Sequence, residues 1–392
     1  MLKCASVFTF EIDNPQAALN EIKTQLARKI TFLGNTVGIV MCNPEFITSG
    51  VLKYVCEGLP FDVAGITTAS QAVNDETGNM ILTIFVMTSD DIWFRTGVTD
   101  SINDNLYETV KTSYDKTAAG ETEPLKLALL FPPYIVYQYS GDAYVRVWNE
   151  IAGGIPVFGT LAADDTLDLS GSETIYNGIN TKDVMPFILC YGNINPRFLI
   201  ATLPENTSLS MNGKVTKSKN NIVYEVNEIN ARMFFTSAGI PDNVGTFPLM
   251  INQNGNESDD KGDAGTVPVI RDLYAYSEND TALFGGDVTE GSTFHFLNFD
   301  SESIKLTSRN EIEQLNKLSD VNGVILFSCA SRQMILSGTN EDNAELQIAK
   351  DTIKQEIPFM LGYSGGEICP VINNKSILNN RFHNYSMVIL II

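Results

Sequence analysis

One order of elements repeats three times along the chain and limits the folds that this sequence can adopt. In each copy an apolar strand is followed by a helical pattern, a second strand that contains a proline and a glycine, and a third apolar strand. The second strands read LPFDVAGITTA, IPVFGTLAA and IPFMLGYSGGE. The copies span residues 37–88, 125–192 and 323–392. We therefore predict three units of one topology, two of them in the N-terminal half.

This order predicts an α/β fold of mixed sheets with packed helices, built from repeated strand–helix–strand–strand units. A strand–helix–strand connection favours parallel strands with a right-handed crossover, and a further strand after a short connection favours an antiparallel neighbour. The continuously apolar strands ILTIFVM and GVILF predict sheets that are buried on both faces. The polar stretch LPENTSLSMNGKVTKSKNN interrupts the pattern, so we expect a domain boundary near residues 200–220.

Composition disfavours several classes of partner. Lys and Arg number 26 against 47 Asp and Glu, which gives a net charge of −21 and argues against binding to nucleic acid or to an anionic membrane surface. No apolar run reaches about 18 residues, so we predict no membrane span. The N-terminal stretch MLKCASVFTFEIDNP lacks the features of a signal peptide. We therefore expect a cytoplasmic protein with reduced cysteines.

No metal or cofactor is expected. The six cysteines form no CxxC pair, and the two histidines, His295 and His383, lack the spacing of metal ligands. The segment from Asn252 to Gly265 resembles a calcium loop only loosely, because its carboxylates do not alternate as such a loop requires. We expect a surface loop there. No phosphate-binding or dinucleotide-binding motif occurs either.

The third unit carries the residues with the clearest ligand chemistry. FSCASR ends an apolar strand and leads toward a helix, whose first backbone N–H groups attract anions. Arg332 can hold a carboxylate through two hydrogen bonds, and Ser328 can donate or accept. Gly365 and Gly366 let backbone amides approach a ligand without interfering side chains, and Glu367 can receive an ammonium group. Together these residues suit a zwitterion such as an amino acid.

Structural roles compete with each of these assignments. Arg332 and Glu367 can pair with each other and hold two loops together. The glycines can serve turn geometry alone. Cys329 can be a small buried hydrophobe, and His383 can be a hydrogen-bonded structural residue. The sequence leaves these alternatives open.

A hydrolase-like enzyme is the rival functional class. Ser328 or Cys329 would be its nucleophile and His383 its base. Glu367 or Asn384 would orient the histidine, and the amides of the SGG loop would stabilise an oxyanion. Against this class, the chain contains no GxSxG nucleophile elbow. Binding without turnover is therefore the interpretation that we favour.

Several stretches, taken in order, resemble the FIST family of sensory proteins, which pairs an N-terminal with a C-terminal FIST module. The C-terminal resemblance rests on GVILFSCASR, IPFMLGYSGGEICP and RFHNYSMVILI. VPVIRDLYAYSENDTALFGGDVTEGSTFHFL resembles the middle segment of the family, and IPVFGTLAADD resembles a motif of its N-terminal half. The resemblance covers roughly residues 35–392. It implies a FIST N-like domain over residues 1–205 and a FIST C-like domain over residues 206–392.

The resemblance also implies a function, that of a small-molecule-binding sensory protein of signal transduction, with amino acids as one ligand class. We expect no output domain in the same chain, so a signal would pass to a separate partner. The predicted ligand-binding residues lie at strand ends and turns of the third unit: Ser328, Cys329, Arg332, Tyr363, Ser364, Gly365, Gly366, Glu367, His383 and Asn384.

Overall fold

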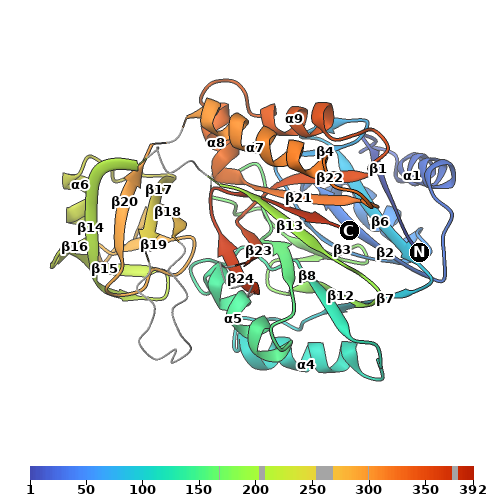
Figure 1. Cartoon of the computed structure of the whole chain (residues 1–392), viewed down its shortest axis with the longest axis horizontal. Helices are drawn as coiled ribbons and strands as arrows, with labels where there is room; N and C mark the ends of the chain where they lie inside the picture. Colours follow the sequence, from blue (N-terminus) through green and yellow to red (C-terminus); the bar gives the residue numbers. More distant parts are fainter. Residues whose placement is uncertain (167, 203–207, 253–267, 299, 373–377) are drawn as a thin grey trace.

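The structure is a computed structural model, and it describes residues 1–166, 168–202, 208–252, 268–298, 300–372 and 378–392. Apart from Asn252, the surface loop expected up to Gly265 lies outside the described residues. Figure 1 shows a large body of sheets and helices with a smaller, mainly β part beside it. The large body contains the three predicted units.

The three units share one topology, which confirms the repeat and the α/β fold. In each unit a central strand pairs with a parallel strand on one side and an antiparallel strand on the other. In unit I the central, parallel and antiparallel strands are β2 (Asn35–Cys42), β3 (Asp62–Thr67) and β6 (Leu82–Ser89). In unit II the corresponding strands are β8 (Leu125–Leu130), β9 (Val157–Thr160) and β12 (Pro186–Gly192). In unit III they are β21 (Val324–Cys329), β22 (Phe359–Ser364) and β25 (Met387–Ile391).

Each unit sends a hairpin into the sheet of another unit, directly after its parallel strand. Unit I reaches the sheet of unit III, unit III that of unit II, and unit II that of unit I. The hairpins are β4 (Gln71–Val73) with β5 (Thr77–Gly78), β23 (Glu367–Ile372) with β24 (Leu378–His383), and β10 (Thr174–Tyr176) with β11 (Ile179–Thr181). The exchange is cyclic, so the units close into a ring of three related parts.

The opposite edge of each sheet holds a strand that precedes a long helix in the chain. The strands are β1 (Leu2–Thr9), β7 (Ile92–Val98) and β13 (Arg197–Ala201), and the helices are α1 (Pro15–Lys29), α4 (Leu106–Ala118) and α7 (Ser301–Leu315). The helices begin alike, because Asn14, Asn105 and Asp300 each accept a hydrogen bond from a backbone N–H of the first turn. Each sheet thus has six strands.

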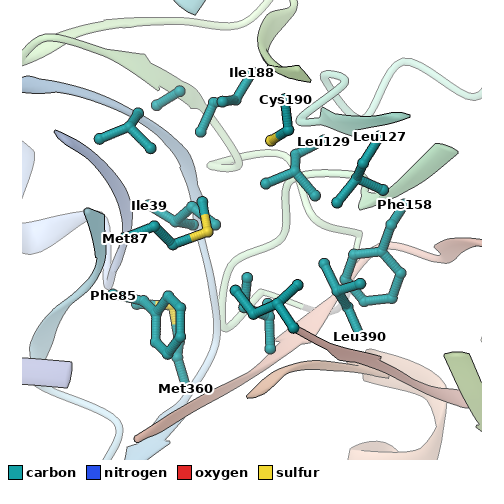
Figure 2. Packing of buried hydrophobic residues seen from close by; sticks show 14 of the residues in the cluster. Ile39, Phe85, Met87, Leu127, Leu129, Phe158, Ile188, Cys190, Met360 and Leu390 are labelled. Atoms are coloured by element: carbon teal, nitrogen blue, oxygen red, sulfur yellow. The ribbon is translucent and has the colours of Figure 1, made fainter. Parts of the chain in front are cut away.

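The sheets turn their inner faces toward one another and bury a common apolar core. Figure 2 shows Ile39 and Met87 of unit I, Leu129 of unit II, and Met360 and Leu390 of unit III in this core. The strands β6 and β21 are buried throughout, which confirms the predicted burial on both faces. Helices cover the outer faces: α1 with α3 (Val51–Glu57), α4 with α5 (Gly141–Ile151), and α7 with α9 (Ala344–Thr352). The short α2 (Glu45–Thr48) precedes α3, and α8 (Ala330–Ser337) precedes α9.

A small β-barrel is inserted between β13 and α7, and it forms the part beside the body in Figure 1. Six of its strands close into a ring through the pairing of β14 with β15, and Phe235, Phe294 and Phe296 fill its core. The domain boundary that the resemblance implies between residues 205 and 206 stays a prediction. The elements of the barrel are β14 (Ser208–Lys219), β15 (Ile222–Val226), β16 (Ile229–Asn230), α6 (Ala231–Ser237), β17 (Phe247–Asn252), β18 (Val269–Tyr276), β19 (Ala282–Phe284) and β20 (Thr293–Leu297).

Arg271 on β18 fastens the barrel to the body. Its side chain is only 2% exposed, and its guanidinium donates to both carboxylate oxygens of Asp142, each at 3.0 Å. Asp142 lies in the first turn of α5 in unit II. The same guanidinium donates to the backbone oxygen of Phe382 on β24 at 3.1 Å. One buried cation therefore joins the barrel to two elements of the body.

The glycine of the repeated motif is required by close packing between the parallel strands. Gly65 is in register with Val40, and Gly159 with Leu130. A Cβ on Gly65 would lie 1.8 Å from the backbone oxygen of Val40, and one on Gly159 would lie 2.0 Å from that of Leu130. No side chain fits at either place without moving a strand.

Replacing Gly159 by alanine should therefore destabilise the protein. The added methyl group would collide with the backbone oxygen of Leu130, and overpacking of this kind costs about 1–3 kcal/mol, occasionally more. Urea denaturation of Gly159→Ala measures the loss. Gly34→Ala is the matched control, because its nearest non-neighbouring atom, Asp90 Oδ1, would lie at 3.4 Å. Equal stability of the two variants would contradict the packing argument.

Candidate ligand-binding site

Three loops meet where the parallel strands end, and backbone hydrogen bonds join them. The loops follow β3, β9 and β22, just before the chain crosses into another sheet. The N–H of Ala163 donates to the oxygen of Thr67 at 3.0 Å, and the N–H of Gly365 donates to the oxygen of Leu161, also at 3.0 Å. The N–H of Tyr363 donates to the oxygen of Ser70 at 3.1 Å. Every unit therefore contributes to one junction.

A cavity of about 550 Å³ opens at this junction, between the body and the barrel. It combines buried residues at its base with exposed acidic residues at its rim. Unit II provides two loops, unit III provides α8 and the segment after it, unit I provides two residues, and the barrel provides part of β18. The lining residues are Ala69, Asn79, Tyr134, Tyr137, Asp164, Asp165, Thr166, Asp168, Leu169, Gly245, Asp272, Tyr274, Ala275, Ala330, Ser331, Gln333, Met334, Ser337 and Asp342.

Asp164 lines this cavity and keeps one carboxylate oxygen without a hydrogen-bond partner among the described residues. Its side chain is nearly buried, at 2% exposure. Its Oδ1 accepts hydrogen bonds from the N–H and the hydroxyl of Thr166, at 2.8 and 2.6 Å. Its Oδ2 has no hydrogen-bond partner among the described residues, and neither does the hydroxyl of Tyr274. A buried polar group without a partner costs about 1–3 kcal/mol, so both groups would gain from a ligand.

Asp272 lies at the base of the cavity and ties the barrel to unit III. It accepts hydrogen bonds from the hydroxyl of Ser331 at 2.8 Å and from that of Tyr385 at 3.0 Å. It also accepts from the hydroxyl of Thr246 and the N–H of Phe247, each at 2.9 Å. Burial raises the pKa of the Asp272 carboxyl, although these hydrogen bonds oppose the shift. The carboxylate is thus already satisfied by the protein.

Three tyrosines stand around the acidic groups. The rings of Tyr137 and Tyr274 pack edge to face, with centroids 5.9 Å apart. The pKa of Tyr134 is raised mainly by burial, and to a smaller extent by the neighbouring acidic groups of Tyr274 and Asp272. Burial likewise raises the pKa of Tyr274. The phenols of Tyr134 and Tyr274 therefore stay protonated and keep neutral hydroxyls.

The residues predicted from the third unit form a buried frame beneath the cavity and do not line it. Arg332 is fully buried and pairs with Glu345 on α9 at 2.8 Å, not with Glu367. Its guanidinium also donates to the hydroxyl of Ser308 at 2.8 Å and to the backbone oxygen of Tyr385 at 3.1 Å. All the hydrogen-bond partners of Arg332 among the described residues are thus protein groups, and a ligand contact for it stays a prediction.

The SGGE loop comes close to unit II, which explains its glycines. The N–H of Gly365 is bound to Leu161, and a Cβ on Gly365 would lie 2.6 Å from the ring of Tyr134. Gly366 has a φ of +124°, and a Cβ there would lie 2.4 Å from the ring of Phe382. Turn geometry and close packing therefore both require glycine here.

Glu367 is buried and bound to serines. Its carboxylate accepts hydrogen bonds from the hydroxyls of Ser364 at 3.2 Å and Ser386 at 2.7 Å. Burial raises the pKa of this carboxyl well above its ordinary value, and the serine hydrogen bonds oppose the shift. The neutral acid is therefore favoured, which weakens the case for Glu367 as the partner of an ammonium group.

The proposed hydrolase residues point to other partners. The hydroxyl of Ser328 donates to Glu345 at 2.9 Å, and Nε2 of His383 lies 3.0 Å from the backbone oxygen of Cys369. Burial lowers the pKa of His383 to about 4 and raises that of Cys329 well above its ordinary value. Cys329 is therefore a buried thiol. Within the described part of the chain, no hydrogen bond joins either nucleophile candidate to the histidine.

Two other predicted residues, Tyr363 and Asn384, keep buried polar atoms without a partner. The atoms are the hydroxyl of Tyr363, which meets no strict hydrogen-bond geometry but lies beside Glu345, and Oδ1 of Asn384, as far as the described residues go. The ligand-binding role of the whole predicted set stays a prediction.

The sequence interpretation missed the acidic loop of unit II. Asp164 and Asp165 end the quoted motif IPVFGTLAADD, at the same place in the repeat as the SGGE loop of unit III. That equivalence was a usable signal. Tyr134, Asp272 and Tyr274 carried no such signal, because only the tertiary structure brings a loop of unit II and a strand of the barrel to this place.

Replacing Arg332 by alanine should lower stability in the absence of any ligand. Glu345 would then be a buried charge without its cation, and breaking such a pair costs about 3–5 kcal/mol. Denaturant melts of Arg332→Ala beside Lys53→Ala test this. Lys53 pairs with Glu57 on the surface, where both side chains are more than half exposed, and such pairs contribute about 0.3–0.5 kcal/mol. Unchanged stability of Arg332→Ala would reject the structural role.

The stability of the protein should also depend on pH through Glu367. Because the folded pKa is raised above the ordinary 4.5, its contribution is complete below about pH 4.5 and is lost as pH rises toward the folded value. The stability of the wild type relative to Glu367→Gln should therefore fall with rising pH, by up to about 1.4 kcal/mol per unit. Melts from acid to neutral pH measure this difference, with Glu57→Gln as the exposed control. A constant difference would contradict the buried acid.

Comparisons with known proteins place the chain in a family. No curated protein matches it. The crystal structure of cyanuric acid hydrolase from A. caulinodans matches over 100% of this chain and 98% of that chain. The sequence identity is 7% and the TM-score is 0.36, and so weak a likeness carries no argument. The FIST N domain model matches residues 36–229, and the FIST C domain model matches residues 228–370. FIST domains are sensory domains of signal transduction that bind small ligands.

No helix in the described residues is both long and apolar enough to cross a membrane. The two domain models together account for most of the sequence, in the order expected from its motifs. The chain belongs to the FIST family of sensory proteins.

Proposed function

We propose that the chain is a sensory protein that binds a small ligand with an ammonium group, an amino acid or a related amine, in the cavity between body and barrel. The observation that carries this proposal is Asp164, which lines the cavity and whose buried Oδ2 has no partner among the described residues. A ligand N–H would satisfy this oxygen and remove the cost of its burial.

The size and make-up of the cavity support a small ligand. Its volume of about 550 Å³ falls within the range of small-molecule sites, which is about 300–1,000 Å³. Its wall combines aliphatic residues such as Leu169 and Met334 with convergent polar groups. This mixture is typical of sites that hold an apolar ligand body and fix one charged end.

The position of the cavity supports a sensory role. Asp272 and Tyr274 belong to the barrel, whereas Asp164 and Ser331 belong to the body. A ligand that touches both sides would favour one arrangement of barrel and body. The shift in free energy between the arrangements equals the difference in the ligand's binding free energy for them. We propose that a separate partner reads this arrangement and that the protein works in the cytoplasm.

Filling the cavity should abolish ligand binding. A thermal-shift screen of metabolites should find compounds that raise the melting temperature of the wild type, because a ligand at 100 times its Kd adds about 2.7 kcal/mol of stability. The same compounds should not stabilise Ala275→Trp, in which the indole would occupy the cavity beside Tyr274. Their concentration should stay constant during incubation, since a sensor does not consume its ligand.

Ala119→Trp is the matched control. Ala119 is exposed at the end of α4 and does not line the cavity. This variant should respond to the compounds as the wild type does. Compounds that stabilise both tryptophan variants equally would bind elsewhere, and that result would overturn the proposed site. Turnover of a compound that depends on Ser328 or His383 would instead favour the hydrolase.

A further inference from the structure

We infer that the cavity selects an organic cation, an amine without a free carboxylate, over zwitterions and anions. This inference rests on the proposed function and narrows its ligand class. The geometry points to Asp164 as the partner of the ammonium group, with the rings of Tyr134, Tyr137 and Tyr274 in the wall of the same cavity.

The wall of the cavity is strongly acidic. Five of its side chains are carboxylates: Asp164, Asp165, Asp168, Asp272 and Asp342. No Lys, Arg or His is among the described residues that line it. The whole chain carries a net charge of −21, which strengthens the negative potential in a concave site. A cation is therefore attracted to the cavity, and an anion is repelled.

Asp164 gives the cation a specific place to bind. The neighbouring residue Thr166 occupies its Oδ1, so the carboxylate is held in one orientation. Its Oδ2 is buried without a partner among the residues described. A hydrogen bond from an ammonium group to a carboxylate is charge-assisted and about twice as strong as a neutral one. The free oxygen of a fixed, buried carboxylate therefore suits an ammonium better than a neutral amide or hydroxyl.

The three tyrosines suit a cation for a second reason. Aromatic faces carry negative potential and attract ammonium groups, more strongly when water is excluded. Tyr134 lines the cavity from a loop of unit II, whereas Tyr274 lines it from the barrel. The hydroxyl of Tyr274 has no partner within the described chain and can accept a second N–H. An ammonium group between Asp164 and these rings would thus have both hydrogen bonds and aromatic contacts.

A carboxylate would find no comparable partner. Arg332, a buried guanidinium of unit III, is bound to Glu345. The first turn of α8 also lines the cavity. Its Ser331 hydroxyl already donates a hydrogen bond to the carboxylate of Asp272, so that a ligand carboxylate there would lie beside a like charge. Lys182 lines a neighbouring cavity of about 380 Å³, and its Nζ donates to the backbone oxygen of Ser170 at 2.7 Å. The carboxylate of a zwitterion would therefore lose its water in the acidic cavity without gaining a cation from the wall of that cavity.

Three probes that share a butyl chain separate these ligand classes. Butylamine carries only the ammonium group, pentanoate carries only the carboxylate, and norvaline carries both. Ligand-observed NMR with the full-length protein measures their dissociation constants, and butyltrimethylammonium tests the aromatic faces separately. Butylamine should bind at least about tenfold more tightly than norvaline, the scale of one hydrogen bond to a charged group. Pentanoate should not bind.

Two isosteric substitutions test the assigned residue. Asp164→Asn keeps the Oδ1 that accepts from Thr166 and replaces the unpaired oxygen by an amide, so butylamine should bind about tenfold more weakly or worse. Asp300→Asn is the control, since Asp300 caps α7 in a similar way outside the cavity, and it should leave affinity unchanged. Thermal melts of both variants check that the fold is retained.

The outcomes distinguish this inference from the proposed function. One contrary result is that norvaline or pentanoate binds more tightly than butylamine, in a way that Ala275→Trp abolishes. That result would overturn the preference for cations and leave the small-molecule site standing. Full affinity of Asp164→Asn for butylamine would reject the assigned carboxylate. If no probe binds in a way that Ala275→Trp abolishes, the inference is also wrong, and the metabolite screen decides on the proposed function separately.

Discussion

The cyclic exchange of hairpins is the constraint on which the rest of the structure depends. β4, β10 and β23 each leave their own unit and pair with the parallel strand of another. A unit alone would expose that strand as an unpaired edge, which invites aggregation. Because each unit supplies the edge strand of the next, all three sheets are completed only together. The same exchange draws the connecting loops to one junction, where the cavity lies.

Buried charges are arranged in two different ways around this junction. Arg332 with Glu345 and Arg271 with Asp142 are ion pairs whose charges are matched within the protein. They hold α8 to α9 and the barrel to the body, and such pairs are costly to break. Asp164, in contrast, keeps one oxygen without a partner in the described structure. The difference separates charges that are matched within the fold from the carboxylate that we propose to meet a ligand.

The inserted barrel gives the ring of three units an asymmetric site. The three loops are related by the repeat, but the barrel stands only between β13 and α7 and covers one side of the junction. Its β18 contributes Asp272 and Tyr274 to the cavity and Arg271 to the contact with α5. One strand therefore both anchors the barrel and contacts the ligand space. Such a strand is well placed to link binding to the position of the barrel.

The sequence by itself determined the repeated units, their mixed pairing and their burial, because each depends on local order and on apolar strands such as GVILF. It also indicated that strand ends in unit III would gather polar groups, but it assigned Arg332 and Glu367 to a ligand. Only the tertiary structure decided that Glu345, on the following helix, pairs with Arg332. It likewise brought Asp164, Tyr274 and Ser331 to one cavity from separate parts of the chain. Local pattern fixes which face of an element is buried, whereas the partner of a buried charge depends on which distant segment packs against it.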